Sequence, residues 1–269
     1  MVFGGADFLG GLGARRAPAL LVTLCAMLVG FAVLVPAALR AGGAPAPVDF
    51  AWSGAGGVLG GLGVALLFHV LALGPVGTVS PIVAVTGCAM PVLAGLFWGE
   101  RPGIAALLGI LAAGVAIVLV SGGPAGDHAR ARTSTLALAG VSGATLGGFL
   151  VCISRVSEAA GLWPLVAARA AGTGSVLAIL LARRERVRID RTGLAICATS
   201  GVLDSIANLL YFWIVKQGAL SIVGTIVSLS PATVVALARI VLHERFHLRQ
   251  VVGLVLAAVA IVLMTAAKR

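Results

Sequence analysis

The chain has 269 residues, of which 60% are apolar and only 10% are charged, and its mean hydropathy is +1.12. A soluble domain contains roughly 25% charged residues, so this composition excludes a water-soluble globular protein and predicts a bilayer environment. The formal net charge of +10 comes mostly from arginines in short loops between apolar runs. No basic stripe is interleaved with aromatic residues, which argues against a nucleic-acid partner.

Ten apolar runs are separated by turn and charge signals, and each predicts a membrane helix. The first run is too short to span a bilayer and lacks the basic start of a signal peptide, so we expect the first helix to be missing about ten residues at its N-terminus. A polar link at residues 123–132 separates the halves. The runs cover residues 1–14, 18–39, 50–73, 76–98 and 103–121, then 133–154, 163–181, 193–215, 219–242 and 251–267.

The two halves repeat one pattern. Residues 74–121 align with residues 218–265 after a shift of 144 positions, and residues 116–119 are identical to residues 260–263. Five spans per half is an odd number, so the repeats must cross the membrane in opposite directions, as in many secondary transporters. We therefore predict an all-α integral membrane protein of two inverted five-helix repeats, at residues 1–122 and 133–269.

Several segments resemble the EamA-type transporters of the drug/metabolite transporter superfamily. They are the opening FGGADFLGGLGARR, the GER that ends the fourth span, and the segments GLWPLVAARA and GVLDSIANLLYFWIVKQGALS. The resemblance covers nearly the whole chain and implies transport of a small metabolite, amino acid or drug. It also implies ten helices with both termini in the cytoplasm, whereas the arginine distribution favours both termini outside.

The eighth span carries an unusual polar face. Asp204, Asn208 and Tyr211 follow one another at i, i+4 and i+7, with Asp204 near the middle of the span. An ionised group at this depth costs about 2.5 to 3.5 kcal/mol on insertion scales. One interpretation is a cavity wall on which Asp204 exchanges a proton for substrate. The alternative is a carboxylate that an arginine neutralises only for packing, and Arg169 of the seventh span is its candidate partner unless its side chain extends to the loop.

Other polar residues and prolines in the spans are further candidates for binding substrate or ions. His69 is either a proton relay or a hydrogen-bonded interior side chain, and Asp7 faces the interior if the first helix forms. Prolines interrupt the backbone hydrogen-bond ladder and predict either hinges or simple bends. The candidate hinges are Pro81, Pro91 and Pro231. The hydroxyl side chains close to these prolines either satisfy the freed backbone groups or contact substrate, and they are Ser80, Thr86, Ser228 and Ser230.

One segment matches a catalytic motif by chance. Residues 243–247 read HERFH, which fits the HExxH helix of zinc proteases. The last span offers no third ligand. The aligned segment of the first half, GERPG, keeps the glutamate, as Glu100 in place of Glu244, but has neither histidine. We interpret both glutamates as structural interface residues. The chain has no P-loop, no GxSxG and no paired cysteines, so we expect no metal, no cofactor and no enzymatic activity.

These features together predict a polytopic secondary transporter of the inner (plasma) membrane that exports its substrate by alternating access. Coupling to protons is expected because no nucleotide-binding motif is present. Its partners would be a small-molecule substrate, bilayer lipid and protons. The alternatives are a membrane-embedded enzyme that uses the HExxH segment, and a membrane protein that binds partners without transporting a solute.

Overall fold

The fold was analysed in a computed structural model that describes residues 2–14, 16–73, 76–121, 133–183, 189–242 and 248–266. Every regular element in these ranges is helical, as the composition predicts for a chain whose backbone must satisfy its own hydrogen bonds in lipid. Five of the described helices, α2, α3, α6, α7 and α8, are long and apolar enough to cross a membrane by length and composition. Shorter apolar stretches lie in the other spans.

The helices agree with the predicted runs to within a few residues at each end. The first repeat contains α1 (Val2–Ala14), α2 (Ala19–Ala41), α3 (Pro47–Leu73), α4 (Val76–Phe97) and α5 (Ile104–Ser121). The second contains α6 (Thr133–Ser154), a 3-10 turn (Glu158–Ala160), α7 (Trp163–Arg183), α8 (Arg191–Val215), α9 (Leu220–Ser228), α10 (Ser230–Leu242) and α11 (Leu248–Ala266). The ninth predicted span is therefore two helices, separated at Leu229.

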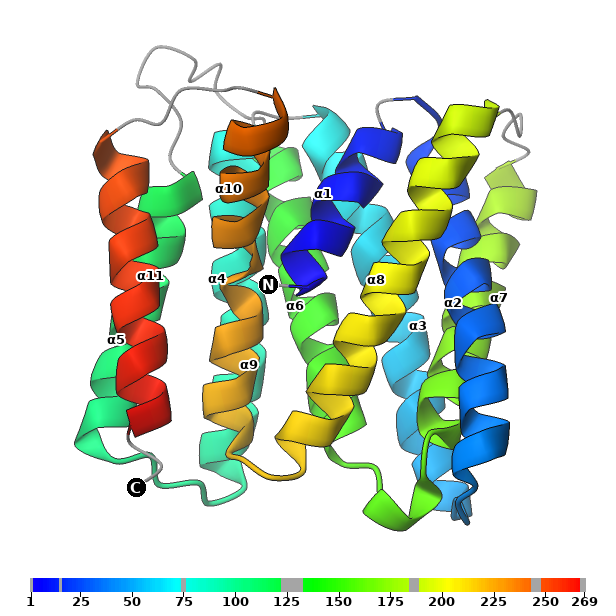
Figure 1. Cartoon of the computed structure of the whole chain (residues 1–269), viewed down its shortest axis with the longest axis horizontal. Helices are drawn as coiled ribbons and strands as arrows, with labels where there is room; N and C mark the ends of the chain where they lie inside the picture. Colours follow the sequence, from blue (N-terminus) through cyan, green and yellow to red (C-terminus); the bar gives the residue numbers. More distant parts are fainter. Residues whose placement is uncertain are drawn as a thin grey trace.

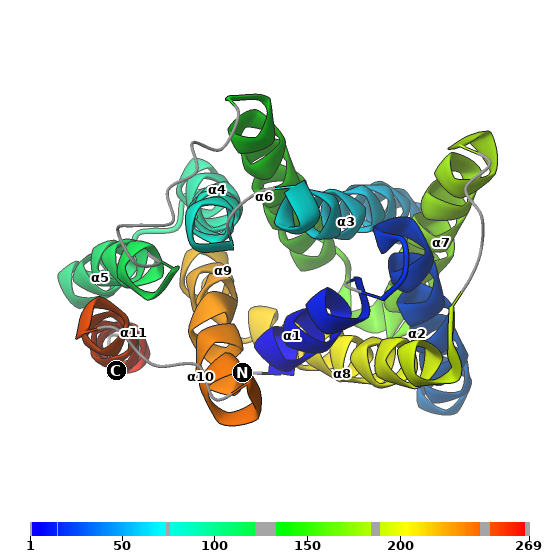
Figure 2. The same cartoon turned by 90° about the horizontal axis from the view of Figure 1, so that it is seen from above.

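The two repeats are inverted, which confirms the predicted architecture. In Figure 1, α1 rises toward the upper face, whereas α6, the first helix of the second repeat, descends toward the lower face. The contacts follow the same symmetry, because α3 packs on α6 while its counterpart α8 packs on α1. Seen from above, α5 and α11 pair at one edge, and the other helices surround the centre of the bundle (Figure 2).

Glycines let the repeats approach closely at equivalent positions. Gly57 of α3 lies against the backbone carbonyl of Ala168 in α7, and Gly201 of α8 lies against the carbonyl of Ala26 in α2. The two glycines are 201 − 57 = 144 positions apart, which is the offset of the sequence repeat. Small residues at such crossings replace the hydrophobic drive that lipid removes between membrane helices.

We expect Gly57→Ala to destabilise the protein, because the added methyl overlaps the Ala168 backbone and cannot be relieved by a side-chain rotation. Overpacking of this kind costs about 1 to 3 kcal/mol, more than the gain in helix propensity from glycine to alanine. Gly54→Ala is the matched control, since a methyl at that position of the same helix meets open space. Thermal unfolding in detergent should separate the two variants, and equal midpoints would contradict the packing account.

The inverted arrangement also predicts the position of two reporter fusions. Five spans separate residues 123–132 from the C-terminus, and five crossings change the side of the membrane. Reporters placed in that link and after residue 269 should therefore lie on opposite sides. Fusions to a periplasmically active enzyme and to a cytoplasmically fluorescent protein measure this directly, and the same side for both positions would contradict the inversion.

Candidate functional site

A cavity of about 200 Å³ lies between the two repeats. Its wall draws residues from α1 to α4 of the first repeat and from α6 to α10 of the second. The described residues that line it include none from α5 or α11, consistent with the position of that pair at the edge of the bundle. Most of the wall is apolar or glycine, and its charged side chains come from α1, α7 and α8.

The ion pair between Arg169 of α7 and Asp204 of α8 is the main electrostatic contact in the wall. The side chains are 11% and 28% exposed, so the guanidinium is the more enclosed partner. Helix α2 closes over the pair at Gly30, where a Cβ atom would stand 3.2 Å from Nε of Arg169 and 2.7 Å from Oγ of Ser205. Of the two orientations open to Arg169 from the sequence, the structure has the one that pairs with Asp204.

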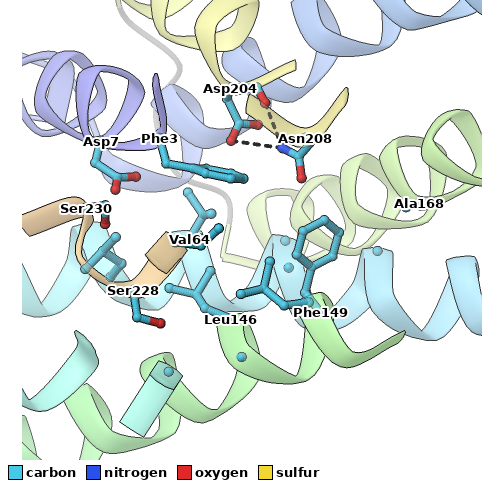
Figure 3. A pocket seen from close by; sticks show the side chains of 18 of the residues that line it. Phe3, Asp7, Val64, Leu146, Phe149, Ala168, Asp204, Asn208, Ser228 and Ser230 are labelled. Carbon is cyan, nitrogen blue, oxygen red and sulfur yellow. Dashed lines mark hydrogen bonds between the residues drawn. The ribbon is translucent and has the colours of Figure 1, made fainter. Parts of the chain in front are cut away.

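Asn208 lies one turn after Asp204 and holds its carboxylate in place. The Asn208 amide nitrogen donates to the Asp204 carbonyl oxygen at 2.7 Å and to Oδ1 of the Asp204 carboxylate at 3.2 Å, and Figure 3 marks these contacts. Because both partners are acceptors, the orientation of the amide is fixed. Asn208 is only 4% exposed, and its amide oxygen, Oδ1, is buried without a hydrogen-bond partner.

Asp7 reaches the same cavity from α1. It stands beside Ser230 at the start of α10 in Figure 3, and it is close enough to Asp204 for the two charges to interact. The ion pairs among the described residues are Arg169–Asp204 and Arg16–Asp190, so Asp7 has no basic side-chain partner there. The described wall therefore holds two carboxylates and one guanidinium.

The cavity includes some of the predicted site residues and leaves others outside. Ser228 and Ser230 line it, and the Ser228 hydroxyl donates to the carbonyl of Gly224 at 2.9 Å. Tyr211 is not among the lining residues: it is 2% exposed in the apolar core, where its hydroxyl donates to the Leu150 carbonyl at 2.7 Å. The eighth span thus has one polar face, but its last member is one turn below the cavity.

Two further candidates are not among the described residues that line the cavity. His69 is exposed on the outer surface near the end of α3, so the sequence-based interpretation of an interior histidine or a proton relay in the wall does not describe its position. Thr86 of α4 donates to the Ile82 carbonyl at 2.7 Å and packs against Gly143 of α6. Its hydroxyl therefore satisfies a backbone carbonyl inside its own helix, which is the first of the two roles expected for these hydroxyls.

The predicted hinges differ from one another. Helix α4 continues through Pro81 and Pro91 as one helix, and the ring of Pro91 packs against Gly224 of α9. The ninth span instead breaks at Leu229, which precedes Ser230 and Pro231, so a proline stands in the first turn of α10, where it is tolerated. The side chains of Ser80, Pro81 and Pro231 and the whole of residues 243–247 lie outside the described residues.

An apolar layer separates the cavity from the lower face of Figure 1. Leu34, Leu150 and Leu165 line the cavity and also belong to a buried cluster that continues to Val156 and Ala160, in the connection between α6 and α7. The Tyr211 hydrogen bond lies within this layer. Passage of a solute toward the lower face therefore requires these helices to separate.

At that face, charged side chains form hydrogen bonds with the backbone at helix ends. The Glu100 carboxylate accepts hydrogen bonds from the first two backbone amides of α9, at 2.6 and 3.0 Å, so the first repeat caps a helix of the second. Lys216 donates to the carbonyls of Ser154 and Val156 at the end of α6, and burial lowers the pKa of its ammonium group. Glu100 is thus an interface residue, as the sequence predicts, whereas Glu244 lies outside the described residues.

The sequence did not identify the apolar residues of the wall. Phe3 lies between Asp7 and Asn208 in Figure 3, and Phe149 lies on the side toward which the Asn208 amide oxygen points. Gly60 faces the Phe149 ring. For Phe3 a signal was present, because it precedes Asp7 by four residues and so shares its helix face. Phe149 and Gly60 carry no such signal in a chain that is apolar throughout.

Known proteins resemble this chain in sequence and in fold. The EamA-like transporter family matches residues 1–122 and 133–266. An uncharacterized protein of Methanocaldococcus jannaschii is 35% identical over 89 residues, a stretch that spans 33% of this chain and 65%, just under two thirds, of that protein. A solved crystal structure of a protein covers 98% of this chain and 95% of its own with a TM-score of 0.78, and its 18% identity supports the fold alone. The chain is therefore a multi-pass membrane protein that belongs to the EamA-like transporter family of the drug/metabolite transporter superfamily.

Proposed function

We propose that this protein is a proton-coupled secondary transporter of the plasma membrane that exports a small metabolite, amino acid or drug. It works by alternating access, has no enzymatic activity and needs no resident cofactor. The family supplies the general activity, and the substrate, direction and coupling ion are our proposal.

The position of the cavity carries the proposal. It lies between two inverted repeats and takes wall residues from both, so a rocking motion of one repeat against the other would change the face from which the cavity is reached. The apolar layer of Leu34, Leu150 and Leu165 would close the lower side in one state. Helix α9, which packs on α4, begins at the cap made by Glu100 and ends at the break at Leu229, and the rocking motion would move it as a short separate segment.

The charges of the wall support coupling to protons. With Asp7 and Asp204 ionised and Arg169 positive, the described wall carries one net negative charge. A charge enclosed in a membrane protein is costly unless it is neutralised, and one proton shared by the two carboxylates achieves this. Ser230, which stands beside Asp7, and Asn208, which contacts Asp204, are the polar neighbours of the pair. Binding of a proton and binding of substrate would then alternate.

Transport in proteoliposomes tests this function. A screen for small molecules that raise the thermal stability of the purified protein supplies a ligand, and radiolabelled ligand is then offered to vesicles preloaded with the unlabelled compound. We expect transient accumulation of label by counterflow, together with movement of protons when a ligand gradient is imposed. A stabilising ligand that binds but shows neither counterflow nor proton movement would contradict the proposal and favour a non-transporting binding protein.

A further inference from the structure

The hydrogen-bond donors of the cavity wall are already engaged within the protein. The Asn208 amide nitrogen donates to two oxygens of Asp204, and the Ser228 hydroxyl donates to the carbonyl of Gly224. Arg169 is paired with Asp204 and only 11% exposed, and Ser230 stands beside the Asp7 carboxylate. A ligand that enters this cavity therefore meets few free donors among the described residues.

The acceptors, in contrast, remain available. Oδ1 of Asn208 is buried and has no partner, and in Figure 3 it points away from Asp204 toward Phe149. An unsatisfied buried acceptor costs free energy that a ligand donor recovers on binding. The Asp7 carboxylate adds acceptors and a negative charge without a basic side-chain partner among the described residues. Both groups call for a ligand that donates hydrogen bonds and carries a positive charge.

The rest of the wall fits an apolar body of modest size. Phe3 lies between Asp7 and Asn208 in Figure 3, so an aromatic ring borders the position that a cation would take. Aromatic faces attract desolvated cations and also bury apolar surface. The Phe149 ring packs against Gly60, where a Cβ atom would stand 3.1 Å from that ring. The absence of a side chain at Gly60 therefore leaves room for the ring. Val64 and Leu146 continue the apolar wall.

We propose that the cavity binds a small organic monocation with N–H donors, that is, a protonated primary or secondary amine with an apolar or aromatic body. Asp7 neutralises the ammonium group, Oδ1 of Asn208 accepts one of its N–H bonds, and Phe3 and Phe149 contact the body. This proposal rests on the proposed function only in that the bound amine is taken to be the transported solute. It adds the chemical class of the ligand, which neither the family nor the fold specifies.

Three probes of similar shape and different charge test it on the wild-type protein. They are phenethylamine, which is cationic at neutral pH, 2-phenylethanol, which is neutral, and 3-phenylpropionate, which is anionic. Calorimetric titration of the detergent-purified protein should rank the amine first and the carboxylate last. We expect the amine to bind roughly 10- to 100-fold more tightly than the alcohol, the range for a hydrogen bond to a charged group.

Variants of one residue assign the preference to Asp7. Asp7→Asn keeps the shape and should bring amine affinity down to that of the alcohol, whereas Asp7→Glu keeps the charge and should retain the preference. Glu158→Gln removes a carboxylate that is exposed on the protein surface, outside the cavity, and should bind all three probes as wild type does.

The results separate this proposal from the proposed function. The amine site is overturned if the alcohol or the carboxylate binds as tightly as the amine, if Asp7→Asn keeps the preference, or if none of the three binds at millimolar concentration. Counterflow of a bound carboxylate would overturn the amine site and leave transport standing. Tight amine binding with no counterflow would support the amine site and contradict the proposed transport.

Discussion

Arg169→Ala is expected to remove most of the folded protein from the membrane. The substitution leaves the Asp204 and Asp7 carboxylates in one cavity without the guanidinium, so the two cannot both stay ionised at the same time. Removing one partner of a buried ion pair costs about 3 to 5 kcal/mol, because the other charge is left uncompensated. Helix α2 also loses the Arg169 side chain that packs against it at Gly30. Yield and thermal stability in detergent, measured by fluorescence-detected size-exclusion chromatography, should both fall.

The double variant Arg169→Ala/Asp204→Ala separates charge from packing. It removes both members of the pair, so it should recover a large part of the stability that the single change loses, even though it deletes more contacts. Arg40→Ala is the control, because Arg40 is exposed at the end of α2. If Arg169→Ala behaves like Arg40→Ala, or if the double variant is the least stable of the set, the ion pair does not have the role assigned to it.

Asp204→Asn should fold and yet lose pH-dependent transport. The change leaves one carboxylate, Asp7, and one guanidinium, Arg169, in the described wall, so the cavity is neutral without a proton. Asparagine keeps the size of the side chain and an oxygen that accepts from Arg169. The charge count makes the same prediction for Asp7→Asn, since either substitution leaves a single carboxylate opposite the arginine.

The measurement is the initial rate of counterflow in proteoliposomes across mildly acidic to mildly alkaline pH. Wild-type protein should show a rate that changes with pH as the carboxylate pair gains or loses its proton, and both variants should give flat profiles. Glu158→Gln serves as the control for a carboxylate outside the cavity and should keep the wild-type profile. A wild-type pH profile in Asp204→Asn would remove this residue from proton coupling and leave only its structural role.

The sequence predicted the helices well, because lipid imposes a simple rule on a spanning segment. Each must satisfy its own backbone and remain apolar for about 20 residues, so runs bounded by glycine, proline and arginine are easily recognised. The break at Leu229 was expected only as a hinge or a bend near Pro231, because periodicity does not show whether a proline bends a helix or begins a new one. The sequence repeat together with the odd number of spans in each half predicted the inversion, and the paired crossings at Gly57 and Gly201 share the 144-residue offset of that repeat.

The site was predicted only in part, and each difference has a physical cause. Spacing along a helix gives the direction of a side chain but not its depth, so Tyr211 shares a face with Asp204 and still lies in the apolar layer below. His69 was assigned to the interior because it is polar, but it lies exposed at the end of α3. The approach of Asp7 in α1 to Ser230 in α10 brings together residues that are far apart in the sequence, and it depends on tertiary packing that no local pattern encodes.

The access of the cavity from the two sides of the membrane tests the central claim most directly. Ser228 lines the cavity, and cysteine replaces it with little change in size. In a background where Cys25, Cys88, Cys152 and Cys197 are alanine, Ser228→Cys would be treated with a membrane-impermeant maleimide in right-side-out and in inverted vesicles. Alternating access between the repeats predicts labelling from both sides, with protection by a bound ligand. Labelling from one side only, in every condition, would contradict the account and identify a cavity that binds but does not transport.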